Sequence, residues 1–232
     1  MPVERIGKFL RFDDLGITPS LGVETDKIDE CIAEVNKSGI KGLFGCPVFG
    51  FKQDNLDFLK ETPDVEQLWF WEINLKNIDG IYNLKNLRYF GIQEKRAPID
   101  FSMFSELEHM VWNYTKKDEG LIELLKVKNF DLWRYNPKAK SYDGLCIPPN
   151  TEKLEVNWAN PSTLEGLQCL PRLREIQFHY CRNLTTLKGL EVIAPNLEKI
   201  VVTRCKNMTD NDALNELKNI KYAYINNERI IS

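Results

Sequence analysis

The side chains that most often carry chemistry are few in this chain of 232 residues, which has two histidines and six cysteines. No two cysteines are spaced as CxxC, the spacing common in zinc and dithiol redox sites. The glycines form neither GxGxxG nor GxxxxGK[ST], the loops that hold nucleotide phosphates. The sequence therefore predicts no metal site, no nucleotide cofactor and no enzymatic activity.

The strands and loops that would position any site are encoded by a repeated sequence pattern. LREIQFHYCRNL, starting at Leu173, recurs as LEKIVVTRCKNM, starting at Leu197. Both copies place apolar residues at positions i, i+3, i+5 and i+11 and a cysteine at i+8. This pattern resembles the leucine-rich repeat, in the variant that carries Cys where other members carry Asn.

The same phase extends through most of the chain. Phe130 could also start a repeat, but Asn136-Pro137 and Asn160-Pro161 fall at equivalent positions only when Val127 is the anchor. The anchors are Ile40, Val65, Leu87, Leu107, Val127, Thr151, Leu173, Leu197 and Ile220.

The resemblance implies an α/β solenoid, a curved leucine-rich-repeat horseshoe with a parallel concave sheet and short helical or irregular convex segments. About eight to nine repeats would cover residues 39–232, with a short α-helix within 210–220 and one last strand in KYAYINNERIIS. Repeats near 22 residues are too short for long convex helices, as in the internalin-like subclass.

Residues 1–38 do not fit the repeat and are expected to cap the N-terminal end of the solenoid. GKFLRF reads as an edge strand and PSLG as a turn. A helix is predicted to follow, N-capped by Thr25 or Asp26 and ending before Gly39.

Side chains alternate along a strand, so residues at i+3 and i+5 face the core while those at i+2, i+4 and i+6 face the concave side. Of the five tryptophans only Trp112 has a core position, and Gly91 leaves a notch on the concave face. Exposed aromatic residues on a sheet usually mark a partner site, although these rings could instead pack on one another and on the cap. The predicted partner-binding residues are Phe44, Trp69, Trp71, Tyr89, His109, Asp131, Trp133, Glu155, Trp158 and His179.

The histidines fit catalysis poorly. His109 and His179 lie three repeats apart, about 20 Å at the usual strand spacing, so they cannot share a metal. Asp131 is about 8 Å from His109 by the same reasoning, with no nucleophile nearby to complete a triad.

These patterns favour a non-enzymatic module that binds another protein through its concave face. It could be a stand-alone inhibitor, such as an immunity protein that blocks a toxin, or an adaptor or regulatory subunit; an enzyme is the remaining, disfavoured class. The net charge of −3 argues against a nucleic-acid partner. Neither an apolar signal-peptide core nor a membrane-length apolar run is found, and the cysteines suit free thiols. We therefore expect a cytoplasmic monomer.

Overall fold

The computed structural model describes residues 3–13, 16–93, 95–210 and 212–231. Over these residues the strands are β1 (Glu4–Ile6), β2 (Phe9–Phe12), β3 (Ser20–Gly22), β4 (Gly42–Gly45), β5 (Gln67–Phe70), β6 (Tyr89–Ile92), β7 (His109–Asn113), β8 (Asn129–Trp133), β9 (Lys153–Asn157), β10 (Glu175–His179), β11 (Lys199–Thr203), β12 (Tyr222–Ile225) and β13 (Glu228–Ile231). The α-helices are α1 (Ile28–Ser38) and α2 (Leu190–Ile193).

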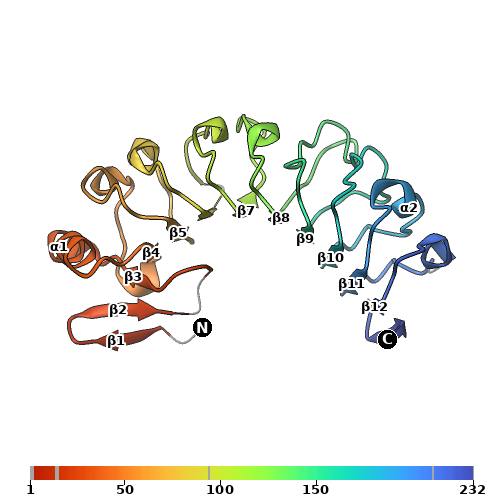
Figure 1. The fold of residues 1–232 in the computed structure, drawn as a ribbon, viewed down its shortest axis with the longest axis horizontal. Coiled ribbons are helices and arrows are strands. Elements are labelled where there is room, and N and C mark those ends of the chain that lie inside the picture. Colours follow the sequence, from red (N-terminus) through yellow and green to blue (C-terminus); the bar gives the residue numbers. More distant parts are fainter. Residues whose placement is uncertain (1–2, 14–15, 94, 211, 232) are drawn as a thin grey trace. The chain divides into compact units, whose positions relative to one another are not determined.

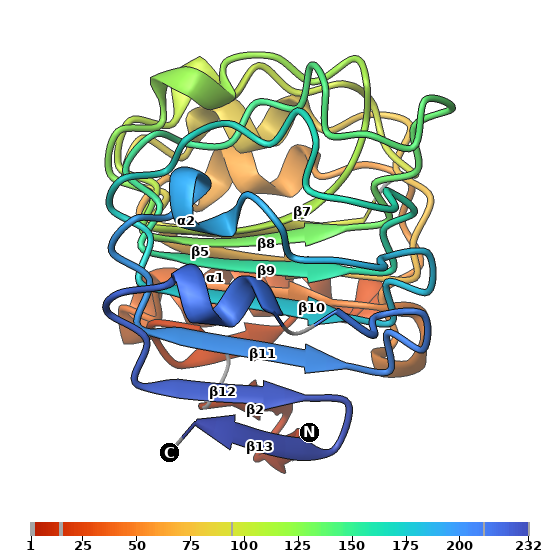
Figure 2. The ribbon, with the colours of Figure 1, turned by 90° about the vertical axis from the view of Figure 1, so that its right-hand side faces the viewer.

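The chain divides into two compact units. Unit 1 comprises Met1–Met110 and Thr115–Gly120, and unit 2 comprises Val111–Tyr114 and Leu121–Ser232. In unit 1, β1 and β2 form an antiparallel hairpin beside β3, and the ladders from β3 to β6 are parallel (Figure 1). In unit 2, β8 to β12 are parallel neighbours in chain order, and β13 returns antiparallel to β12 (Figure 2). The described chain is thus a mostly parallel, strand-rich sheet with few helices, which confirms the coarse part of the predicted fold class.

The repeat phase is confirmed by strand register. Each strand from β4 to β12 begins two residues after a predicted anchor, and the parallel ladders align these first residues. Asn129 pairs with Lys153, which confirms Val127 as the anchor of its repeat. The side chains at i+3 and i+5 are buried from Leu68 and Phe70 through to Ile200 and Val202, so they form the core of each unit.

Apart from α1, the segments that return between strands contain only short helices, mostly 3-10, and the described segments from β8 to β9 and from β9 to β10 contain none. α2 has only four residues, and Asp212–Glu216 is a 3-10 helix where the sequence suggested an α-helix. A repeat of this length supplies one strand and the return to the next strand, which leaves room for only a short helix. The 3-10 helices are Thr25–Lys27, Pro47–Phe49, Asp57–Glu61, Asp79–Asn83, Phe101–Met103, Leu121–Glu123 and Asp212–Glu216.

The predicted helix before Gly39 is present as α1. Gly39 has a left-handed backbone (φ 70°) and donates its N–H to the carbonyl of Val35, which closes the helix as expected. The predicted N-cap was wrong: the Thr25 hydroxyl accepts a hydrogen bond from the backbone N–H of Lys52, and a 3-10 turn precedes the helix.

Both ends of the chain contain strands that the sequence did not predict. GKFLRF was predicted as an edge strand, but β2 lies between β1 and β3, so the edge strand is β1. PSLG was predicted as a turn, but Ser20–Gly22 is β3, and it pairs with both β2 and β4. At the other end, Asn226 and Asn227 both have positive φ, the requirement of a tight two-residue hairpin. The chain therefore turns back as β13 and does not end on β12.

Within the described ranges, no helix is long and apolar enough to cross a membrane.

Candidate functional site

We call the sheet surface formed by residues at i+2, i+4 and i+6 the front face. In unit 1 the N-terminal segment covers this face. Phe44 is fully buried against Phe12, their ring centroids 6.2 Å apart, and Leu10 belongs to the same cluster. Trp71 stacks on Phe44 with centroids 6.2 Å apart and planes within 20°. Phe44 therefore has no surface to offer a partner, and its predicted exposure was wrong.

The cover extends over β5 and β6. The amide of Gln67 bridges to the backbone of Ile17 and Thr18. Tyr89 keeps only 5% of its surface, so its predicted exposure was also wrong. Trp69 occupies the notch left by Gly91, because a Cβ at that glycine would lie 2.3 Å from the indole.

Three of the predicted residues of unit 1 keep part of their surface. Trp69, Trp71 and His109 are half-buried, and His109 packs edge-on against Tyr89 at 4.6 Å between ring centroids. The rings of this face thus pack mainly on one another and on the N-terminal segment. Their packing therefore contributes mainly to the stability of unit 1 and leaves little of their surface for a partner.

In unit 2 the front face is partly exposed at most positions from β8 to β12, although Val111 and Asn113 of β7 and Asn157 of β9 are buried. Asp131, Trp133, Glu155 and His179 are all partly exposed, as predicted. Asp131 aligns with Glu155 across β8 and β9, and the next ladder pairs His179 with Asn157.

Both ring nitrogens of His179 are hydrogen-bonded to neighbouring side chains. Its Nδ1 lies 2.6 Å from the hydroxyl of Thr203 and its Nε2 lies 2.9 Å from Oε1 of Gln177, whose amide nitrogen donates to Glu175. Because that amide oxygen must accept, the proton of the neutral imidazole sits on Nε2. Burial lowers the pKa of His179, so the neutral form predominates at neutral pH. The imidazole is therefore a structural bridge.

A column of left-handed residues follows the strands at i+7. Their φ angles are positive although none is glycine, a backbone that costs a side-chain-bearing residue about 1–2 kcal/mol. In unit 2 three of these residues donate their N–H to a carbonyl of the next repeat: Arg134 to Asn157, Trp158 to His179 and Tyr180 to Thr203. The residues of the column with positive φ are Glu72, Arg134, Trp158, Tyr180, Arg204 and Asn227.

The left-handed backbone turns these side chains along the edge of the sheet, where the strand spacing brings neighbours into contact. Trp158 and Tyr180 stack with centroids 4.3 Å apart and planes within 4°. The guanidinium of Arg204 lies 5.2 Å from the Tyr180 ring centre, and that of Arg182 lies 5.9 Å from the Trp158 ring centre. Trp158 remains 41% exposed. We call Trp158, Tyr180, Arg182 and Arg204 the aromatic–cationic edge.

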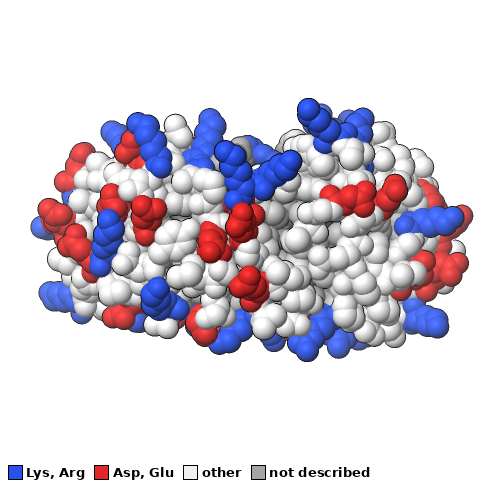
Figure 3. All heavy atoms as spheres, turned by 90° about the horizontal axis from the view of Figure 1, so that it is seen from above, with Lys and Arg blue, Asp and Glu red and all other residues white. Residues whose placement is uncertain are grey.

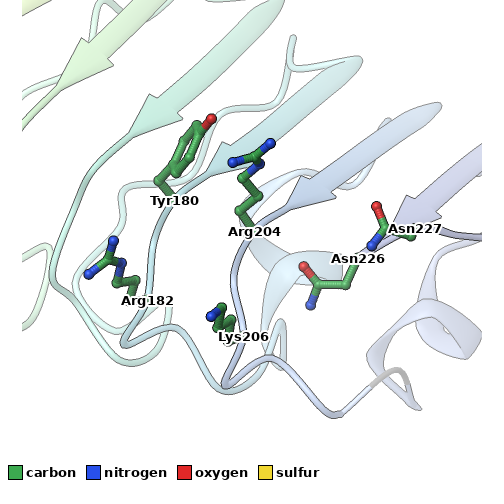
Figure 4. Close-up of a pocket in the computed structure, with 6 residues that line it drawn as sticks. All are labelled: Tyr180, Arg182, Arg204, Lys206, Asn226 and Asn227. Carbon is green, nitrogen blue, oxygen red and sulfur yellow. The ribbon is translucent and has the colours of Figure 1, made fainter.

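An open pocket of about 650 Å³ lies beside this edge. Figure 4 shows Arg182 on the loop after β10, with Arg204 and Lys206 on the loop after β11, around one space. None of these three cations has a described carboxylate within ion-pair distance. The lining residues are Tyr180, Arg182, Arg204, Lys206, Asn226 and Asn227.

Just before the N-terminal ends of the same strands, acidic and basic side chains balance one another in charge. Position i+1 alternates in sign along the chain, and its members form ion pairs between adjacent repeats. Glu198 accepts hydrogen bonds from Lys221 and Arg174, and both lower its pKa. The i+1 residues are Lys41, Glu66, Arg88, Glu108, Lys128, Glu152, Arg174, Glu198 and Lys221.

Acidic and basic side chains are also interspersed over the segments that return between strands (Figure 3). The three pocket cations differ from the i+1 cations Arg174 and Lys221 in having no described ion pair, and they gather around one space.

The six cysteines are all free. Cys181 and Cys205 occupy the buried i+8 position, where each thiol lies 3.5–3.6 Å from two backbone carbonyls. A hydrogen bond with Cys205, together with burial, raises the pKa of Cys181. These two thiols stabilise the loop that carries the aromatic–cationic edge. No cluster of three His, Cys, Asp or Glu side chains suited to a metal ion occurs among the residues that the structure describes.

Sequence reasoning placed Trp158 at the rim but missed Tyr180, Arg182, Arg204 and Lys206. The signal that could have found them lies at positions i+7 and i+9. These positions follow the strand, so their side chains do not alternate between the two faces of the sheet. Aligned in repeat phase, these columns put aromatic and basic residues side by side.

No protein-family model matches the sequence, and a search of curated proteins finds no match either.

Proposed function

We propose that this chain is a non-enzymatic leucine-rich-repeat protein that binds a partner protein through unit 2. The contact surface would combine the open front face at Asp131, Trp133 and Glu155 with the aromatic–cationic edge. In this proposal the repeats form the curved horseshoe of that class. The strand register and the buried i+3 and i+5 residues support that form.

The observation that carries the proposal is the exposed stack of Trp158 on Tyr180. Both residues hold a backbone conformation better suited to glycine or asparagine, and Asn227 occupies the equivalent position in the last repeat. Glu72, Arg134 and Arg204 hold the same backbone, so the positive φ belongs to the repeat. What sets Trp158 and Tyr180 apart is that they place two large stacked rings on this edge, with Trp158 41% exposed, and this supports binding. Aromatic residues are also the side chains most enriched among the dominant contacts of protein interfaces.

The proposal includes a cytoplasmic, reducing compartment and a monomeric state. Six free thiols, four of them buried, support the compartment. An inhibitor, such as an immunity protein, and an adaptor would use the same surface. They differ in what binding does to the partner, so assaying the partner's own activity with and without this chain separates them.

The test is a titration. The partner is captured from the host cell, purified and titrated with the wild-type chain and with Trp158→Asn, which keeps a residue tolerant of positive φ. We expect the variant to weaken binding by about 2 kcal/mol, the typical effect of losing a central aromatic contact. Val192→Ala is the matched control, since Val192 is 69% exposed on α2, away from the front face. Unchanged affinity for Trp158→Asn, or an equal loss for the control, contradicts the proposal.

A further inference from the structure

The pocket beside the aromatic–cationic edge has the chemistry of an anion receptor. Arg182, Arg204 and Lys206 lack described carboxylate partners, whereas the i+1 cations Arg174 and Lys221 are ion-paired with Glu198. Like charges gathered without counter-charges repel one another, and an incoming anion relieves that repulsion. Guanidinium groups bind carboxylate and phosphate in forked pairs of hydrogen bonds.

The arginines are also positioned in advance. Arg204 lies over the Tyr180 ring and Arg182 over the Trp158 ring, and the rings support each other by stacking. Contact with an aromatic face restrains a long side chain before the ligand arrives, which lowers the entropic cost of binding. The left-handed backbone at Tyr180 and Arg204 fixes where these side chains leave the sheet.

The same stack argues against a nucleobase. Tyr180 has Trp158 on one side and the Arg204 guanidinium packed against its ring, so it offers no free face on which a base could stack. The neighbouring front face mixes Asp131, Glu155 and Glu175 with Lys153 and Lys199, and both lysines are ion-paired with Glu175. It therefore offers no run of free cations along which a phosphodiester backbone could lie.

We infer that the pocket receives an acidic segment of the partner protein, with adjacent Asp or Glu carboxylates binding Arg182, Arg204 and Lys206. This inference rests on the proposed function, because the segment belongs to the partner that unit 2 binds. Adjacent repeats lie about 4.8 Å apart, a distance that neighbouring carboxylates on one chain can span. Asn226 is not part of the receptor, since its amide is already bonded to the N–H and carbonyl of Cys205. Asn227 remains at the margin of the pocket as an exposed polar neighbour.

The test uses a fluorescently labelled oligoglutamate peptide, with fluorescence anisotropy at low ionic strength as the readout. Oligoglutamine, inorganic phosphate and oligothymidylate serve as competing probes. We expect oligoglutamate to bind, oligoglutamine not to bind, and added salt to weaken the complex. Arg182→Gln and Arg204→Gln should each weaken binding about 10-fold, as expected for losing one charge-assisted pair of hydrogen bonds.

The matched control is Arg174→Gln, which removes an exposed arginine of the same repeat as Arg182, but one that is paired with Glu198. It should leave oligoglutamate binding unchanged. Failure of oligoglutamate to bind, an equal loss in Arg174→Gln, or tighter binding of oligothymidylate overturns the inference. Binding of phosphate alone also overturns it, because the pocket would then be a site for a small free anion.

The purified partner separates this inference from the proposed function. If Trp158→Asn weakens partner binding while Arg182→Gln and Arg204→Gln do not, the acidic-segment inference is wrong and the proposed function stands. If Trp158→Asn has no effect on partner binding, the proposed function itself fails, whatever the peptide result.

Discussion

The indole of Trp158 and the phenol ring of Tyr180 lie 4.3 Å apart between centroids and within 4° of parallel, on residues whose φ angles are 57° and 58°. The stack arises from the repeat itself. Equivalent residues in adjacent parallel strands are separated by about one strand spacing, and the left-handed turn projects both along the sheet edge. A recurring backbone conformation thereby converts a column of sequence positions into a continuous surface.

Removing this stack should change stability little. Trp158→Asn and Tyr180→Asn lose ring contacts but relieve the strain of a positive φ, so each should alter the free energy of unfolding by less than about 1 kcal/mol. Trp112→Ala is the contrast, because Trp112 is 3% exposed and packs on Phe130, and it should lose roughly 3–5 kcal/mol. Urea melts measure all three. Global unfolding of Trp158→Asn would mean that the indole belongs to the core.

Phe44→Ala should destabilise unit 1 by roughly 3–5 kcal/mol, since the ring is fully buried beneath Phe12 and against Trp71. Partner affinity per folded molecule should be unchanged. Thermal unfolding followed by tryptophan fluorescence gives the first quantity, and titration below the melting temperature gives the second. Loss of affinity without loss of stability would restore Phe44 as a contact residue.

A buried ion pair fixes the loops that follow β6 and β7 in unit 1. Both nitrogens of the Arg96 fork donate to Asp118, at 2.9 Å and 2.6 Å, and both side chains have no exposed surface. Asp118→Ala leaves the guanidinium buried without its counter-charge and should cost roughly 3–5 kcal/mol. Exposed pairs contribute little, so Asp57→Ala, which breaks an exposed pair with Lys60, should cost less than about 1 kcal/mol. If Asp118→Ala and Asp57→Ala lowered the free energy of unfolding equally in chemical denaturation, the Arg96–Asp118 pair would not be the stabilising buried ion pair described here.

His179 should make stability depend on pH. Burial lowers its folded-state pKa below 6.5, with Lys153 acting in the same direction while Glu155 and Asp131 oppose it. Between 6.5 and the lower folded value the unfolded chain binds more protons, so stability falls as pH drops through that window and levels off below it. His179→Asn should flatten the pH dependence over this range. If the free energy of unfolding of His179→Asn depended on pH as steeply as that of the wild type, the pH dependence would arise from a group other than His179.

The sequence predicted the strand register well and the exposure of front-face side chains less well, and one physical reason explains both outcomes. Apolar residues at i+3 and i+5 must be buried, so Leu154 and Val156 report their position directly. A front-face aromatic residue can be buried or exposed depending on what covers it. Nothing local to Phe44 or Tyr89 encodes the N-terminal segment, whose hairpin packs on Phe44 and whose Gly16 lies against Tyr89. The turn predicted at PSLG failed similarly, because pairing with two neighbouring strands overrode a local turn preference.

The aromatic–cationic edge was missed because Tyr180 and Arg204 lie one residue beyond the strand. There the rule of alternation ends and a left-handed backbone decides where the side chain points. Only Trp158 was recognised, as a tryptophan at the rim of the concave face.

Hydroxyl-radical footprinting of the complex tests the central claim most directly, because it reports the exposure of individual side chains. The chain carries its own control: Met103, 49% exposed on the 3-10 helix Phe101–Met103, is readily oxidised and lies away from the front face. On saturation with the purified partner, oxidation of Trp158 and Tyr180 should fall several-fold while that of Met103 stays constant. Protection of Met103 with no change at Trp158 and Tyr180 would contradict the account.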